Sequence, residues 1–131
     1  MEHKDRIALS EYRIESAESC LTDANALFQI ESYKGATNRA YYAVFNAMRA
    51  VLAMDGIDRK RHSGVISEFQ RLYLKTHVFD ASYSRIISNA FALRVGGDYQ
   101  DYYVISKQEI ADLIADAESF VQAVKDYLSS S

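Results

Sequence analysis

The chain has 131 residues with a formal net charge of -3, one cysteine, five glycines and no proline. A chain of this length predicts a single domain, spanning residues 1–131, around one hydrophobic core. The negative net charge gives no overall attraction for nucleic acid, so any contact with RNA has to be local. The lone cysteine excludes an internal disulfide, and no stretch resembles a signal peptide or reaches membrane-spanning length. We therefore expect a cytoplasmic protein with no membrane segment.

The composition favours an all-α fold, because uninterrupted helices need few glycines and no proline. Apolar residues recur at intervals of three and four and predict about five helices. The expected ranges are 5–30, 33–54, 63–75, 81–95 and 106–128. The second helix is apolar over a wide arc and carries several short alanines, which permit close approach of neighbouring helices. We predict that this helix is central.

The first helix has a helical but fairly polar pattern, and Cys20 within it is expected to be a small buried side chain. The pattern consists of Leu9, Tyr12, Ser16, Cys20, Asp23 and Leu27 with their neighbours Ala17, Ala24 and Phe28.

Capping residues predict where the later helices begin. Ser63 and Asp80 are expected N-caps, and Ser106 with Glu109 forms a capping box before the last helix. Glycines, which readily take the left-handed conformation, are expected at the ends: Gly35 in the break after the first helix, Gly56 after the second, and Gly96 with Gly97 after the fourth.

Arg94 is conspicuous in the fourth helix. It falls on the apolar stripe of that helix, one turn beyond Ala90. A long cation there can extend past the helix end, pair with a carboxylate or face a polar cleft. It can also simply be a cation near the C-terminus of the helix, where it interacts favourably with the helix dipole. The sequence leaves these alternatives open.

Two polar groups of residues could complete a cleft with Arg94. Carboxylates and phenols follow it in the chain: Asp98, Tyr99, Asp101, Tyr102 and Tyr103. Such a set can hold a phosphate or stack a base, or an Arg94–Asp98 pair can merely close the turn. On the second helix Asn38, Tyr42 and Asn46 recur every four residues as a polar stripe. That stripe is either solvated or part of the same cleft.

Other chemistries have no support in the sequence. His3, His62 and His77 lie far apart with no ligand partner at helical spacing, so we expect no metal site. No glycine-rich loop has the spacing that cradles phosphates, and no serine, threonine or cysteine stands in a recognisable nucleophile setting. We therefore expect no metal and no cofactor.

Three segments together resemble the HEPN domain family, in its branch of small stand-alone prokaryotic proteins. They are RAYYAVFNA at 39–47, KRHSGVI at 60–66, and ALR at 92–94 leading into DYQDY at 98–102. The resemblance implies an up-and-down helical bundle that forms a homodimer. It also implies a partner, a minimal nucleotidyltransferase that is often encoded beside the HEPN protein. In such a toxin–antitoxin pair the HEPN protein is the toxin. Active members of the family are metal-independent ribonucleases.

The family's catalytic motif is an arginine followed four to six residues later by a histidine, contributed by both protomers. Only the arginine matches here, as Arg94, and the window after it holds Asp98 and Tyr99 but no histidine. His62 belongs to a different segment, and whether it reaches Arg94 depends on the fold.

Three hypotheses remain open. In the first, the chain is a toxin–antitoxin or defence protein, a metal-independent endoribonuclease with Arg94, Tyr99 and Asp98 catalytic. Its substrate-binding residues are then Asn38, Tyr42, Asn46 and Tyr102. In the second reading the chain is a non-catalytic dimeric module that binds nucleotide, RNA or the nucleotidyltransferase, which could modify a tyrosine hydroxyl at Tyr99 or Tyr102. A helical scaffold in which Arg94 only closes a turn is the third alternative.

Overall fold

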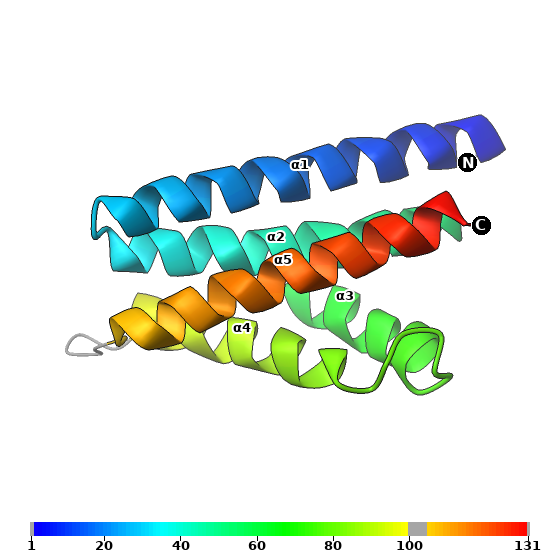
Figure 1. The fold of residues 1–131 in the computed structure, drawn as a ribbon. Helices are drawn as coiled ribbons and strands as arrows, with labels where there is room; N and C mark the ends of the chain where they lie inside the picture. Colours follow the sequence, from blue (N-terminus) through cyan, green and yellow to red (C-terminus); the bar gives the residue numbers. More distant parts are fainter. Residues whose placement is uncertain (1, 100–104, 131) are drawn as a thin grey trace.

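The computed structural model describes residues 2–99 and 105–130, without the side chains of residues 97–99. Every regular element within these residues is helical. In chain order they are α1 (His3–Gln29), α2 (Tyr33–Met54), α3 (His62–Phe69), the π-helical turn η1 (Gln70–Leu74), α4 (Tyr83–Tyr99) and α5 (Lys107–Ser129). The helices run up and down (Figure 1), which confirms the predicted all-α bundle.

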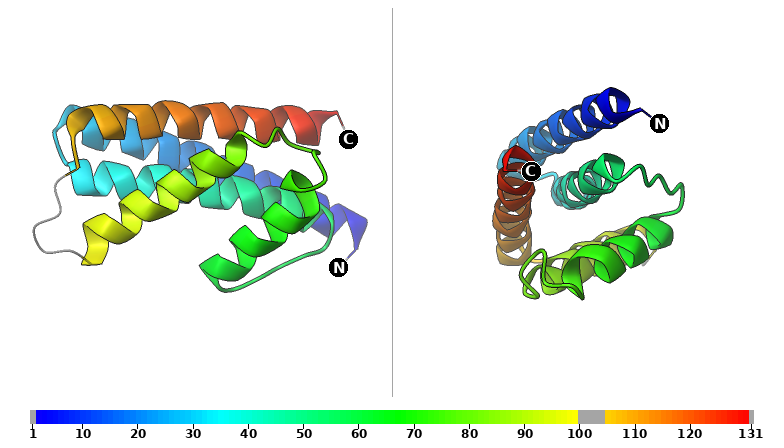
Figure 2. Two further views of the ribbon diagram at one scale, coloured as in Figure 1. Left: turned by 90° about the horizontal axis from the view of Figure 1, so that it is seen from below. Right: turned by 90° about the vertical axis from the view of Figure 1, so that its right-hand side faces the viewer.

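The bundle is arranged around α2. Helices α1 and α2 lie side by side and antiparallel, α5 runs along both, and α4 crosses at an angle on the other side of α2 (Figures 1 and 2). The N- and C-termini lie at the same end of the bundle (Figure 1). Both α3 and α4 pack on α2, so residues far apart in the sequence meet on one helix.

The prediction that α2 is central is confirmed. Its alanines are fully buried and let α1 and α5 approach closely. These residues are Ala36, Ala40, Ala43, Ala47 and Ala50. The larger side chains of α2, Tyr41 and Phe45 among them, are buried too and fill the space toward α3 and α4.

The residues of the pattern predicted for α1 lie only partly on its buried face. The buried residues of α1 are Ser10, Arg13, Ala17, Cys20 and Ala24. Cys20 is buried as expected, but Tyr12 is 66% exposed. Small side chains and one charged residue face α2, because the alanine-rich surface of α2 leaves little room for large ones.

Several predicted helix ends also differ. Arg61, not Ser63, is the N-cap of α3, and α4 begins at Tyr83 after Asp80 accepts a hydrogen bond from the Ser82 backbone N–H. Gly35 lies within α2, and the chain instead reverses at Glu31, which has a φ of 62°.

Helix α4 continues through Gly96 and Gly97 to Tyr99, although both glycines were expected to end it. Glycine permits a left-handed turn but does not force one, and in a helix it costs only about 1 kcal/mol. Two other expectations are confirmed: Gly56 has a φ of 73°, and Ser106 and Glu109 form the capping box of α5.

The bundle has one contiguous hydrophobic core to which all the long helices contribute. Across the described ranges 2–99 and 105–130, no helix combines the length and apolar character needed to cross a membrane.

Candidate functional site

Arg94 reaches from α4 across to α2. Its Nε donates a hydrogen bond to Asn38 Oδ1 at 3.3 Å, and its Nη2 donates to Tyr42 Oη at 3.4 Å. The guanidinium carbon lies 5.1 Å from the Tyr41 ring centroid and 5.4 Å from that of Tyr42. Aromatic faces attract a cation, so these rings stabilise a charge on an otherwise apolar helix stripe. Among the side chains that the structure describes, the guanidinium faces a polar cleft; Asp98, the partner in the alternative ion pair, lies outside them.

That cleft is an open pocket of about 620 Å³ beside the start of α2. Its lining consists of Ser32, Lys34, Gly35, Asn38, Tyr42 and Arg94. Lys34 is exposed, so its ammonium adds a second positive charge to that of Arg94. Hydrogen-bond donors and two cations near a helix N-terminus suit an anionic ligand such as a phosphate group.

A histidine also belongs to this neighbourhood. His62, the first residue of α3, has its Nδ1 atom 2.8 Å from Tyr41 Oη. Its ring packs against Phe45 at a centroid distance of 4.3 Å and meets Tyr42 edge-on at 5.7 Å. Tyr41 and Tyr42 therefore touch both Arg94 and His62. This contact is hard to predict from sequence, because Tyr41 and His62 are 21 residues apart and lie on different helices.

Burial and nearby charges shift the pKa values of both His62 and Tyr41. Burial, and then the positive charges of Arg94 and Arg49, lower the pKa of His62 below its usual value of 6.5. Burial raises the pKa of Tyr41 to about 12, so its phenol keeps its proton at physiological pH. At neutral pH the site therefore holds a neutral imidazole next to a neutral phenol.

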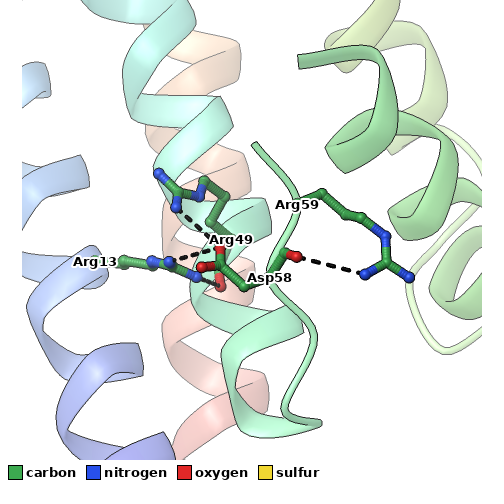
Figure 3. A network of polar contacts seen from close by, with 4 residues as sticks. All are labelled: Arg13, Arg49, Asp58 and Arg59. Carbon is green, nitrogen blue, oxygen red and sulfur yellow. Dashed lines mark hydrogen bonds and ion pairs between the residues drawn. The ribbon is translucent and has the colours of Figure 1, made fainter. Parts of the chain in front are cut away.

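A charge network fixes the loop that leads to His62 (Figure 3). Asp58 Oδ1 accepts hydrogen bonds at 3.1 Å from both Arg13 Nη2 and Arg49 Nη2, and Arg13 Nη1 also donates to the Arg49 carbonyl. The Arg13 side chain is only 7% exposed. The hydrogen bond from Arg49 and the further bond from Arg13 lower the pKa of Asp58 despite partial burial. The loop is thus tied to both α1 and α2, four residues before His62.

The structure brings together only some of the residues predicted for the site. Asn38 and Tyr42 contact Arg94 as the cleft hypothesis required. Asn46 does not line the pocket, because its Nδ2 faces Cys20 Sγ of α1 at 3.9 Å.

The site residues predicted to follow Arg94 in the chain lie outside the residues or side chains that the structure describes. The side chains of Asp98 and Tyr99, and the whole of Asp101, Tyr102 and Tyr103, lie beyond the described part. Within the part that is described, no group of three His, Cys, Asp or Glu residues is placed to hold a metal ion.

Comparisons with known proteins match the whole bundle. The HEPN domain model matches residues 10–127. A UPF0332 protein of Thermotoga maritima is 33% identical over 125 residues, which are 95% of this chain and 93% of that protein. A UPF0332 protein of Archaeoglobus fulgidus is 36% identical over 116 residues, 88% of this chain and 92% of its own length. A Methanocaldococcus jannaschii protein named "Putative toxin MJ0605" is 35% identical over 115 residues, covering 88% of this chain and 85% of the relative.

Proposed function

The chain belongs to the HEPN family, and on that premise we propose that it is a toxin-type protein that cleaves RNA without a metal ion. The reaction takes place at the pocket that Arg94 forms with Lys34, Asn38 and Tyr42. The name of the Methanocaldococcus relative supports the toxin class, and the pocket supports an anionic substrate.

The observation that carries this proposal is the way in which Arg94 is held. Asn38 and Tyr42 orient the guanidinium, and two tyrosine rings lie beside it, so its direction is fixed before a substrate binds. A preorganised cation stabilises the charge that develops on a phosphate oxygen during phosphodiester cleavage. A planar guanidinium can also bind two phosphate oxygens at once. Lys34 adds charge for the neighbouring backbone of the RNA.

We further propose that the protein acts as a homodimer and has a minimal nucleotidyltransferase as its partner. Phe91 supports the dimer. It lies on α4 one turn before Arg94, is 38% exposed, and its ring centroid is 6.1 Å from that of Tyr41. A second copy that covers Phe91 would bring a second Arg94 close to the first.

Metal-free cleavage of a mixed pool of structured and single-stranded RNAs tests the function. The assay contains EDTA and compares the wild type with Arg94→Ala and Arg85→Ala. Arg85 is the matched control, because it is exposed on the same helix but lines a different pocket, with Asn89 and Asp112. We expect the wild type and Arg85→Ala to cut RNA, and Arg94→Ala to lose roughly 100-fold or more of the rate, as loss of a transition-state donor does.

Equal cleavage by Arg94→Ala and the wild type would refute the assignment of the pocket. If the wild type retains RNA through Arg94 but cuts none of the pool, the cleft is the binding site of a non-catalytic module, and the ribonuclease function is wrong.

A further inference from the structure

We infer that His62 is the general base of the Arg94 site and that Tyr41 positions it. The inference rests on the proposed ribonuclease function and names the group that replaces the histidine missing from the window after Arg94. It also assigns a role to His62, which lies on α3, 21 residues after its hydrogen-bond partner Tyr41 on α2.

Arg94 and His62 lie beside the same aromatic pair. Arg94 and His62 both adjoin the rings of Tyr41 and Tyr42, at centroid distances between 5.1 and 5.7 Å. The cation that would bind the phosphate and the imidazole that would move a proton are thus arranged around one pair of rings. His62 is half-buried, and its ring contacts that of Tyr42, which lines the Arg94 pocket.

The His62 ring is held in one orientation. One ring nitrogen, Nδ1, is bound to Tyr41 Oη, whereas Nε2 has no hydrogen-bond partner among the residues that the structure describes. Packing against Phe45 further restricts the ring. A histidine that uses one nitrogen to fix its position and leaves the other open has the arrangement that a general base needs.

Tyr41 can serve as partner in both protonation states of His62. Its hydroxyl accepts a hydrogen bond when Nδ1 carries a proton, which leaves Nε2 free to accept one. Because the tyrosine side chain is 1% exposed and its ring lies inside the bundle, the hydroxyl position is fixed by packing. Tyr41 acts through His62, so it is a positioning residue.

The step that follows is an internal transesterification of RNA. His62 Nε2 takes the proton of the ribose 2′-hydroxyl while the 2′-oxygen forms a bond to the adjacent phosphorus. The bond from phosphorus to the 5′-oxygen breaks, and that oxygen takes a proton from water. The proton on His62 then neutralises the hydroxide left behind. The products are a 2′,3′-cyclic phosphate and a 5′-hydroxyl, and Arg94 stabilises the charge on the phosphate oxygens.

The surrounding charges determine how the rate depends on pH. On the α4 side His62 faces Arg94. On the α2 side it faces Arg49, Tyr41 and Tyr42, and Lys60 and Arg61 precede it in the chain. Burial and the cations Arg94 and Arg49 lower the pKa of His62, so the base is unprotonated at neutral pH. The rate should therefore rise with pH through a value below 6.5 and then become constant.

The alternative is that His62 only packs at the start of α3. A pH–rate profile separates the two roles, measured for the wild type, His62→Asn, Tyr41→Phe and His3→Gln. His62→Asn can keep a polar contact to Tyr41, and His3 is an exposed control at the start of α1. We expect His62→Asn to lose roughly 100-fold or more of the rate together with the acidic limb of the profile. Tyr41→Phe should shift that limb and lower the rate, and His3→Gln should match the wild type.

The outcomes separate this inference from the proposed function. If His62→Asn keeps the wild-type rate and acidic limb while Arg94→Ala is inactive, the inference is wrong and the ribonuclease function stands. If the wild type cuts no RNA, both the general-base role of His62 and the ribonuclease function are wrong.

A second measurement decides the case in which His62→Asn fails to fold. The imidazole nitrogens of wild-type His62 are followed by NMR while 2′-O-methyl RNA, which cannot be cleaved, is added. A change in the Nε2 signal supports the inference, and an unchanged signal at saturation overturns it.

Discussion

Replacing Asp58 with Asn tests how the loop before His62 is held. The variant keeps the shape of the side chain but removes the charge that accepts hydrogen bonds from Arg13 and Arg49, each at 3.1 Å. Hydrogen bonds to a charged group contribute about 1.5–3 kcal/mol, against about 0.5–1.5 kcal/mol for neutral ones. Converting two charged hydrogen bonds into neutral ones would cost about 2–3 kcal/mol of stability. Because Asp58 is 53% exposed, solvent screens its charge and reduces this cost. We expect a loss of about 1–2 kcal/mol in the free energy of unfolding.

Urea denaturation at pH 7 measures this loss, with Glu15→Gln as the control. Glu15 is an exposed carboxylate on the same helix as Arg13 and makes no ion pair among the described residues, so its change removes one negative charge without breaking the network. The folded state lowers the pKa of Asp58, so its contribution is fully present above the unfolded pKa and is lost as pH falls through the lower, folded value. The wild type and Asp58→Asn should therefore converge in acid. A difference at pH 7 no larger than that of Glu15→Gln would refute the reasoning.

Two further predictions concern assembly and stability. Phe91→Glu should convert the proposed dimer to a monomer, as measured by sedimentation velocity. The control Val78→Glu should not, because Val78 is 46% exposed but precedes α4. A dimer that survives Phe91→Glu would place the interface elsewhere. Ser106→Ala removes a cap that accepts from the Glu109 backbone N–H at 3.1 Å and should cost about 1 kcal/mol in the free energy of unfolding. Ser130→Ala at the other end of α5 is its control, and equal stability of the two variants would contradict the role of the cap.

The sequence predicted well what depends on local pattern. The alanines of α2, the capping box at Ser106 and the loop at Gly56 each follow from neighbours within a few residues. Arg94 was found because a charge on an apolar helix stripe is unusual. Its contact with Asn38 and Tyr42 was one of two alternatives that the sequence left open for the polar stripe of α2.

The sequence could not predict features that depend on distant contacts. Arg13 is buried because Asp58, 45 residues away, neutralises it, and no local pattern shows that pairing. His62 joins the site only because α3 and α4 both pack on α2. The wrong prediction at the glycines of α4 has a different reason: glycine allows a helix to end but does not force it to, and α4 continues to Tyr99.

The most direct test of the Arg94 pocket is the affinity for a fluorescent single-stranded 2′-O-methyl RNA, measured by anisotropy at several salt concentrations. The proteins compared are the wild type, Arg94→Ala and Arg85→Ala. Loss of a charge-assisted contact of about 1.5–3 kcal/mol predicts that Arg94→Ala binds roughly tenfold to a hundredfold more weakly and with a smaller salt dependence. Arg85→Ala should bind like the wild type. Equal affinity and equal salt dependence of Arg94→Ala and the wild type would contradict the assignment of the RNA site to this pocket.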